Sequence, residues 1–356
     1  MLLKLKLFGA IFGIFLALGF LTSAQAQLKV GFVYIGPIGD HGWTYQHNHG
    51  RLAIEEALGV KTTYVEKVPE NADAQRVIAK LVSTGHGLIF TTSFGYMNPT
   101  LRVAKRFPKV RFEHATGYKR SKNVSTYSAR FYEGRYVVGK IVGNMTKTNV
   151  IGYVASFPIP EVIRGINATF LAARSVNPKV KIKVVWVSTW FGPGKESDAA
   201  KTLIDQGADI IMQHTDSPAP VQTAEKRGVF AIGQASDMRS FGPKAHLTSI
   251  VNNWGPYYVS RTKAVVNKTW KSRNTWQGFK EGMVKLAPYN KILPKKVIAL
   301  AEKTRKGIIA GTIHPFAGEI KDQDGKVRVQ AGKRPNDGML AGMKFYVQGI
   351  KGSIPK

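Results

Sequence analysis

Short apolar segments alternate with helical patterns along nearly the whole chain, and this alternation restricts the possible fold more than any other feature. In the first third of the chain, strands are predicted over residues 28–34, 62–65, 87–91 and 110–112, and helices over 43–58, 72–83 and a segment that ends at 106. Strands that alternate with helices in this way form parallel sheets with right-handed crossovers.

The same pattern then begins again. A helix over 132–145 leads to strands at 150–155, 183–187, 209–213 and 229–232, with helices between them. We therefore predict an α/β protein of two doubly wound parallel-sheet lobes with a ligand cleft between them. The first lobe is expected over 27–120 plus a returning segment of about 252–285, and the second over 121–251 plus the C-terminal segment of about 286–356. A late hairpin is predicted over 320–327.

The first 26 residues are predicted to be a signal peptide. Lys4 and Lys6 precede an apolar stretch over 7–21, and Ala24-Gln25-Ala26 follows as a cleavage site. The alternative is a membrane anchor, but the apolar stretch is shorter than the roughly 20 residues that a spanning helix needs. We expect cleavage after Ala26 and a protein of the periplasm. The chain has no cysteine, so neither disulfides nor a lipid-modified cysteine can form.

A formal net charge of +30 raises the question of a nucleic-acid partner. The Lys and Arg residues are spread along the chain and form no block of five or six like charges. Together with the export signal, this distribution favours a basic solvated surface. We expect a monomer that has neither a nucleic-acid partner nor a cofactor.

Candidate binding residues follow the predicted strands, because ligands of open parallel sheets bind beyond the carboxyl ends of the strands. Aromatic rings recur in these loops and offer faces for a flat ligand, and single carboxylates beside them accept hydrogen bonds. The candidates are Asp40, Trp43, Phe94, Phe157, Trp190, Asp216, Asp237 and Asn252. The set favours a planar heterocycle with polar edges over an anion. For Asp40 the alternative is a cap on the first helix, and for each ring it is core packing.

Enzymatic signals are weak. The segment 192–195 lacks the spacing of a phosphate loop, and 260–263 matches S-x-x-K without the motifs that usually accompany it. His41, His47 and His49 form a loose group without cysteine or an H-E-x-x-H motif, and we expect His47 and His49 on the outer face of the first helix. No catalytic and no metal-binding residue is predicted.

Five segments resemble the basic membrane protein family, the purine-nucleoside-receptor-like branch of periplasmic binding proteins. They cover residues 39–43, 130–136, 150–154, 205–211 and 229–233, the last leading to Asp237. The resemblance extends over essentially the whole mature chain. It implies a type I periplasmic binding protein fold, a purine held between aromatic rings in the cleft, and an ABC permease as partner. It also implies that Trp43 is one stacking ring and that Asp237 is the carboxylate used against the ligand.

Two departures from the family pattern concern the ligand. Members that bind nucleosides often carry Lys in the returning segment, where this chain has Asn252, and Phe is common where this chain has Trp43. The resemblance and these departures together imply a purine base or a purine nucleoside as the ligand, and we expect the free base to bind at least as tightly. The alternatives are an exported purine-nucleoside hydrolase and a ligand-sensing protein for a small heterocycle.

Overall fold

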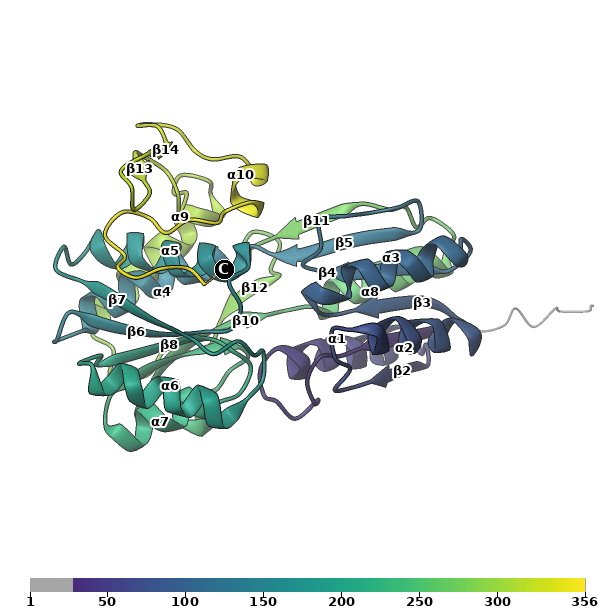
Figure 1. Ribbon diagram of the computed structural model, residues 1–356, viewed down its shortest axis with the longest axis horizontal. Helices are drawn as coiled ribbons and strands as arrows, with labels where there is room; N and C mark the ends of the chain where they lie inside the picture. Colours follow the sequence, from purple (N-terminus) through teal and green to yellow (C-terminus); the bar gives the residue numbers. More distant parts are fainter. Residues whose placement is uncertain (1–27, 356) are drawn as a thin grey trace, which may run out of the picture.

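The computed structural model describes residues 28–355, so the predicted signal peptide and its cleavage site lie outside the described residues. Two six-stranded sheets form two lobes that lie side by side along the long axis of the molecule (Figure 1). Both sheets place their first five strands in the same order, with the second strand at one edge and the first strand beside it. The predicted repetition of one doubly wound unit is therefore confirmed.

The first sheet is parallel throughout and has the order β2-β1-β3-β4-β5-β11. Its strands are β1 (Lys29–Val33), β2 (Thr62–Val65), β3 (His86–Thr91), β4 (Arg111–Ala115), β5 (Val124–Ala129) and β11 (Asn274–Gln277). Its helices are α1 (Trp43–Leu58), α2 (Ala72–Ser83), α3 (Met97–Arg106), preceded by the short η1 (Phe94–Tyr96), and α8 (Gly255–Val266).

Both faces of the first sheet are covered because neighbouring residues of a strand point to opposite sides. Phe32 and Phe90 pack in an apolar cluster with residues of α1 and α8. Their neighbours Val33 and Ile89 pack in a second cluster with residues of α2 and α3. This double burial explains why the strands are continuous apolar runs in the sequence.

The second sheet has the order β7-β6-β8-β9-β10-β12, and β12 alone runs antiparallel to its neighbour. Its strands are β6 (Val150–Ala155), β7 (Lys181–Trp186), β8 (Ile210–His214), β9 (Phe230–Ala235), β10 (His246–Asn252) and β12 (Val284–Leu286). Its helices are α4 (Phe131–Met145), α5 (Pro160–Arg174), α6 (Pro193–Asp205), α7 (Ala219–Arg227) and α9 (Lys295–Ile309), and the short η2 (Arg239–Phe241) follows β9.

The chain passes between the sheets at three places, from β5 to α4, from β10 to α8 and from β11 to β12. The predicted lobe boundary at residue 120 lies before β5, which pairs with β4, so the first sheet extends through Ala129. The returning segment supplies α8 and β11 to the first lobe and then re-enters the second lobe with β12.

The C-terminal segment lies against the second lobe (Figure 1). The predicted hairpin is present as β13 (Ile320–Lys321) and β14 (Val327–Val329), which pair antiparallel, and α10 (Asp337–Ala341) follows. Asn167 of α5 fixes the segment through its Oδ1, which accepts a hydrogen bond from the backbone N–H of Val347 at 3.1 Å. Between residues 28 and 355, no helix combines the length and apolar character needed to cross a bilayer.

Candidate ligand-binding cleft

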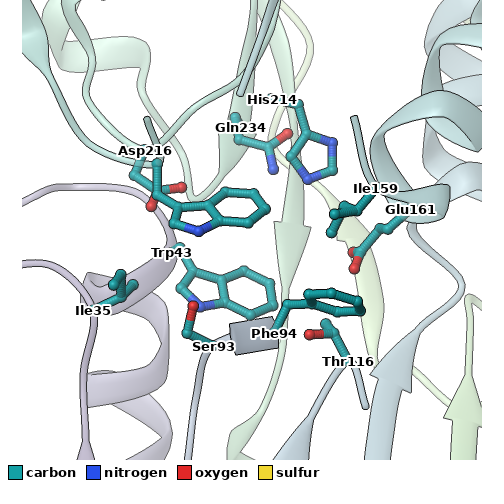
Figure 2. A pocket seen from close by; sticks show the side chains of 11 residues that line it. Ile35, Trp43, Ser93, Phe94, Thr116, Ile159, Glu161, His214, Asp216 and Gln234 are labelled. Carbon is teal, nitrogen blue, oxygen red and sulfur yellow. The ribbon is translucent and has the colours of Figure 1, made fainter. Parts of the chain in front are cut away.

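A small cavity of about 20 Å³ lies where the carboxyl ends of the two sheets face each other (Figure 2). We call it the ring slot. It is lined by Ile35, Trp43, Ser93, Phe94 and Thr116 from the first lobe and by Ile159, Glu161, Trp190, His214, Asp216 and Gln234 from the second. Four of the eight predicted binding residues, Trp43, Phe94, Trp190 and Asp216, therefore meet there.

The first lobe contributes rings held in fixed positions. Trp43 is the first residue of α1, and its indole Nε1 donates a hydrogen bond of 2.6 Å to the backbone oxygen of Thr92. The same indole meets the ring of Trp254 edge to face, with centroids 5.6 Å apart. Phe94 begins η1 directly after Ser93, on the loop that follows β3. The first lobe thus holds the faces of two aromatic rings, those of Trp43 and Phe94, at the carboxyl end of its sheet.

The third ring comes from the second lobe. Trp190 lies on the loop after β7 and packs against Phe157 with centroids 5.0 Å apart. Its indole Nε1 donates a hydrogen bond of 3.2 Å to Oε2 of Glu70 in the first lobe. Phe157 is not among the residues that line the ring slot, so it supports Trp190 from behind.

Asp216 brings a buried carboxyl group to the slot. Its Oδ2 is buried without a hydrogen-bond partner among the described residues. Burial raises the pKa of Asp216 well above its usual value, and the negative charge of Asp40 raises it further. A carboxyl group that holds its proton offers both a donor and an acceptor, which matches the edge of a nitrogen heterocycle.

Three polar residues that the second lobe contributes to the slot were not predicted from the sequence, and neither were Ser93 and Thr116 of the first lobe. His214 ends β8, Gln234 lies in β9, and Glu161 lies in the first turn of α5. The Nδ1 atom of His214 is buried without a partner, and burial lowers the pKa of this imidazole well below its usual value. Burial also raises the pKa of Glu161. For His214 and Gln234 the available signal was a polar residue at or near the carboxyl end of an apolar strand, whereas Glu161, in the first turn of a helix, carries no such signal.

Gln234 is held from behind by a buried cation. Its Oε1 accepts a hydrogen bond from Nη2 of Arg135, which also donates to the backbone oxygen of Gln213 at 2.7 Å. Because the amide oxygen is used in this way, its amide nitrogen is the group of Gln234 that remains to donate to a ligand. Figure 2 shows Gln234 and His214 close together at one end of the slot, opposite Phe94.

The other predicted residues lie outside the slot. Asp40 is fully buried, and its carboxylate accepts hydrogen bonds from the backbone N–H groups of Gly42, Thr44 and Tyr45 at 2.8–2.9 Å. These bonds correspond to the alternative considered for this residue, a cap on the first helix. Asp237, predicted to point into the cleft, is exposed and forms an ion pair of 2.6 Å with Arg239.

Asn252 is fully buried at the end of β10 and does not line the slot. Its side-chain oxygen and nitrogen have no hydrogen-bond partner among the described residues.

The prediction for His47 was wrong. This residue is fully buried on the inner face of α1, where its ring stacks on Trp254 at 4.9 Å and its Nδ1 lies 2.5 Å from the hydroxyl of Tyr258. His49 is exposed, as expected. Within residues 28–355, no group of three His, Asp or Glu side chains is placed to hold a metal ion.

The lobes touch each other beside the slot. The hydroxyl of Ser236 in the second lobe donates a hydrogen bond to the backbone oxygen of His41 in the first. A Cβ atom on Gly42 would lie only 2.1 Å from the backbone oxygen of Asp216, so glycine is required for this approach. Ligand pockets commonly enclose about 300–1,000 Å³. Since the slot encloses far less, its walls have to separate to admit a ring.

Two doubly wound lobes, three crossing segments and a polar, ring-lined cleft between the lobes define a two-lobed solute-binding protein. A solute-binding protein of an ABC transporter system from Aeropyrum pernix K1 has the same fold, with a TM-score of 0.69 at 20% identity over 88% of this chain and 97% of that chain. A transcriptional activator of the comK gene from Bacillus halodurans has a TM-score of 0.69 at 24% identity over 81% of this chain and 99% of its own.

Residues 27–316 match the family described as Bmp, the ABC transporter substrate-binding protein PnrA-like family. The chain belongs to this family, whose members bind small-molecule ligands and act with membrane permeases. The Purine-binding protein of Brucella abortus (strain 2308) is 55% identical over 95% of this chain and 97% of its own length. The Putative ABC transporter glucose-binding protein of Haloferax volcanii is 35% identical over 94% of this chain and 83% of its own.

Proposed function

We propose that this substrate-binding protein is exported to the periplasm and captures a purine, base or nucleoside, in the ring slot for an ABC importer. The observation that carries the proposal is the meeting of Trp43 and Phe94 from one lobe with Trp190 and Asp216 from the other. Rings suit the faces of a flat heterocycle, and the polar groups beside them suit its edges. The name of the Brucella relative supports the same ligand class.

In this proposal the two lobes make different kinds of contact with the ligand. The base stacks on Trp43, while Asp216, His214 and Gln234 exchange hydrogen bonds with its ring nitrogens and exocyclic groups. These side chains are largely buried, so hydrogen bonds to the ligand form away from competing water. The protein itself performs no chemical step, and the ligand-bound closed form is the form that docks on the permease.

The predicted advantage of a free base over its nucleoside rested on Asn252. That residue is not among those that line the slot, so it gives no reason to exclude a sugar. We propose that the base occupies the slot and that any substituent extends out of it.

Calorimetric titration tests the ligand class. We expect adenine, hypoxanthine, guanine or their nucleosides to bind, and glucose, which the name of the Haloferax relative suggests, not to bind. Glucose binding without purine binding would overturn the proposal. Incubating a nucleoside with the protein serves as a second arm, because release of free base would identify a hydrolase instead.

Export is tested separately. Intact mass of the protein recovered from the periplasm is expected to correspond to a chain that starts at Gln27. Retention of residues 1–26 would contradict cleavage after Ala26.

A further inference from the structure

A second, larger cavity of about 560 Å³ adjoins the ring slot, and we call it the basic cavity. Phe94, Thr116, Ile159 and Glu161 line both spaces, so the two are neighbours across a shared wall. The remaining lining residues are Gly117, Tyr118, Arg120, Ser128, Pro160, Arg164, Asn274, Trp276, Ala341, Gly342 and Lys344. The volume lies within the range of about 300–1,000 Å³ that is common for ligand pockets.

Part of this cavity is built by a segment outside the family match. The match ends at residue 316, whereas Ala341, Gly342 and Lys344 lie beyond it. The segment is held over the cavity by two arginines. Arg130, at the crossing from β5 to α4, makes a two-pronged hydrogen bond with the carboxylate of Asp337 at 2.8 and 2.7 Å. Arg164 donates from Nη1 to the backbone oxygen of Leu340 at 2.6 Å.

The charges around the cavity are mostly positive. The lining of the cavity contains one carboxylate, that of Glu161, and three cationic side chains, those of Arg120, Arg164 and Lys344. Arg120 and Lys344 are exposed, and neither forms an ion pair with a carboxylate in the described part of the chain. Glu161 also lines the ring slot, so the negative charge lies at the shared wall and the cations Arg120 and Lys344 lie only in the basic cavity.

Arg164 is the most constrained of the three cations. It is 5% exposed, and its guanidinium lies 4.9 Å from the ring centroid of Trp276 and 5.5 Å from that of Tyr132. Its Nε is buried without a hydrogen-bond partner. A guanidinium fixed by stacking, with N–H groups to spare, is suited to bind the oxygens of a phosphate because little side-chain freedom remains to be lost.

The backbone adds a second positive feature. The 15-residue helix α5 begins at Pro160 in the wall of the cavity, and no side chain caps its first turn. Pro160 has no N–H and the N–H of Val162 donates to the backbone oxygen of Ile159 at 3.1 Å, so the N–H of Glu161 and the helix dipole are what this N-terminus offers to an anion. Arg164 lies one turn further along the same helix, so both features act on the same space.

We propose that the basic cavity binds the phosphate of a purine nucleotide whose base lies in the ring slot. This inference rests on the proposed function and extends it from purines to their phosphorylated nucleosides. The shared wall brings the base and the phosphate into adjoining spaces, and the C-terminal segment supplies Lys344 to the second space.

The test compares calorimetric titrations of adenine, adenosine and adenosine monophosphate against the whole protein. We expect the monophosphate to bind at least about tenfold more tightly than adenosine at low salt, the scale of a charge-assisted hydrogen bond. The advantage is expected to shrink as salt screens the exposed cations. In the double variant Arg120→Ala/Lys344→Ala, the affinity advantage of the monophosphate over adenosine is expected to fall to about twofold or less. The affinity for adenine is expected to stay unchanged.

A matched variant controls for net charge. Lys201→Ala/Arg227→Ala removes the same two charges from another cavity, on α6 and α7, and is expected to retain the preference for the monophosphate. The proposal is overturned if adenosine monophosphate binds no more tightly than adenosine, or if both double variants lose the preference equally. If neither these three ligands nor the hypoxanthine and guanine bases and nucleosides bind, the purine assignment itself is overturned, so the two failures are distinguishable.

Discussion

In the first lobe the buried Arg261 is paired with a carboxylate, whereas in the second lobe the buried Arg135 has no carboxylate within ion-pair distance in the described part of the chain. Arg261 Nε lies 2.5 Å from Oε1 of Glu113, and Glu113 also accepts hydrogen bonds from Tyr257 and Trp270 at 2.6 and 2.7 Å. Arg135 donates to Gln213 and Gln234, and its Nε and Nη1 have no partner among the described residues.

The two lobes also differ at the ring slot, in whether their buried polar groups have hydrogen-bond partners. On the first lobe, the indole N–H of Trp43 is already bonded to the backbone. On the second lobe, His214 Nδ1 and Asp216 Oδ2 are buried without partners. Buried polar groups without partners cost free energy that a ligand with matching groups recovers. In the proposed complex, the first lobe therefore offers a preformed stacking surface, and the second lobe gains most of the new hydrogen bonds.

The largest expected effect is on the stability of the first lobe. Glu113→Ala leaves Arg261 buried without its counter-charge, and we expect a loss of about 3–5 kcal/mol in the free energy of unfolding. Urea denaturation without ligand measures it, with Asp73→Ala as a control. Asp73 pairs with Arg76 on the surface, where such pairs contribute about 0–1 kcal/mol. A loss no larger than that of the control would remove the contrast between the lobes.

The next effect concerns ligand binding by the second lobe. Asp216→Ala removes a buried hydrogen-bonding group and leaves its partner on the ligand unsatisfied, so we expect purine binding to weaken by about 1–3 kcal/mol. Asp237→Ala removes a carboxylate that is exposed and paired with Arg239, and we expect no change in affinity. Calorimetry on both variants decides which carboxylate faces the ligand, and a larger loss for Asp237→Ala would restore the role that the family resemblance implied.

Stacking on the first lobe should contribute a comparable amount. Trp43→Ala is expected to weaken binding by about 1–3 kcal/mol, the range for a base on an aromatic ring. Trp43→Phe keeps a ring and should recover most of that loss. Circular dichroism verifies that α1 is intact, and an unchanged affinity in Trp43→Ala would leave Trp43 with a structural role alone.

The smallest effect is a dependence of stability on pH in the first lobe. Burial lowers the pKa of His114 to about 3, below the ordinary value of 6.5. Between these values only the unfolded chain binds the proton, so the contribution of His114 to stability falls with decreasing pH by about 1.4 kcal/mol per unit. The difference in unfolding free energy between wild type and His114→Gln should shrink accordingly from pH 6.5 to 5.5. A constant difference would contradict a neutral buried imidazole.

Much of the fold was predictable because its signals are local. The helices at 43–58 and 72–83 begin and end where the apolar spacing predicts. The strands β5 and β10 were missed because they are rich in Ser and Thr, which resemble loop residues in a sequence. Their hydroxyl groups are satisfied only in the fold, as when Ser125 accepts a hydrogen bond of 2.9 Å from Arg261 and Thr248 donates one of 2.8 Å to Ala287.

The site was predictable only in part, and β9 shows why. The apolar run predicts a strand that ends at residue 232, but β9 continues to Ala235. The extra residues carry Gln234 to the slot and leave Asp237 beyond the strand, on the surface. Loop composition pointed to several of the strand ends that line the ring slot, whereas the direction of each side chain depends on strand length and on the buried Arg135 behind Gln234.

The contact of Gly42 with Asp216 affects the ligand concentration at which half of the protein molecules are occupied. With the lobes this close, the slot holds about 20 Å³, so a flat ligand binds only to molecules whose walls stand further apart. The apparent dissociation constant is then the intrinsic one divided by the fraction of molecules in that wider form. Gly42 and Ser236 lie at the contact between the lobes but do not line the slot, so changes at these positions adjust uptake without touching the solute. The sensitivity of the importer can thereby change while its ring slot stays the same.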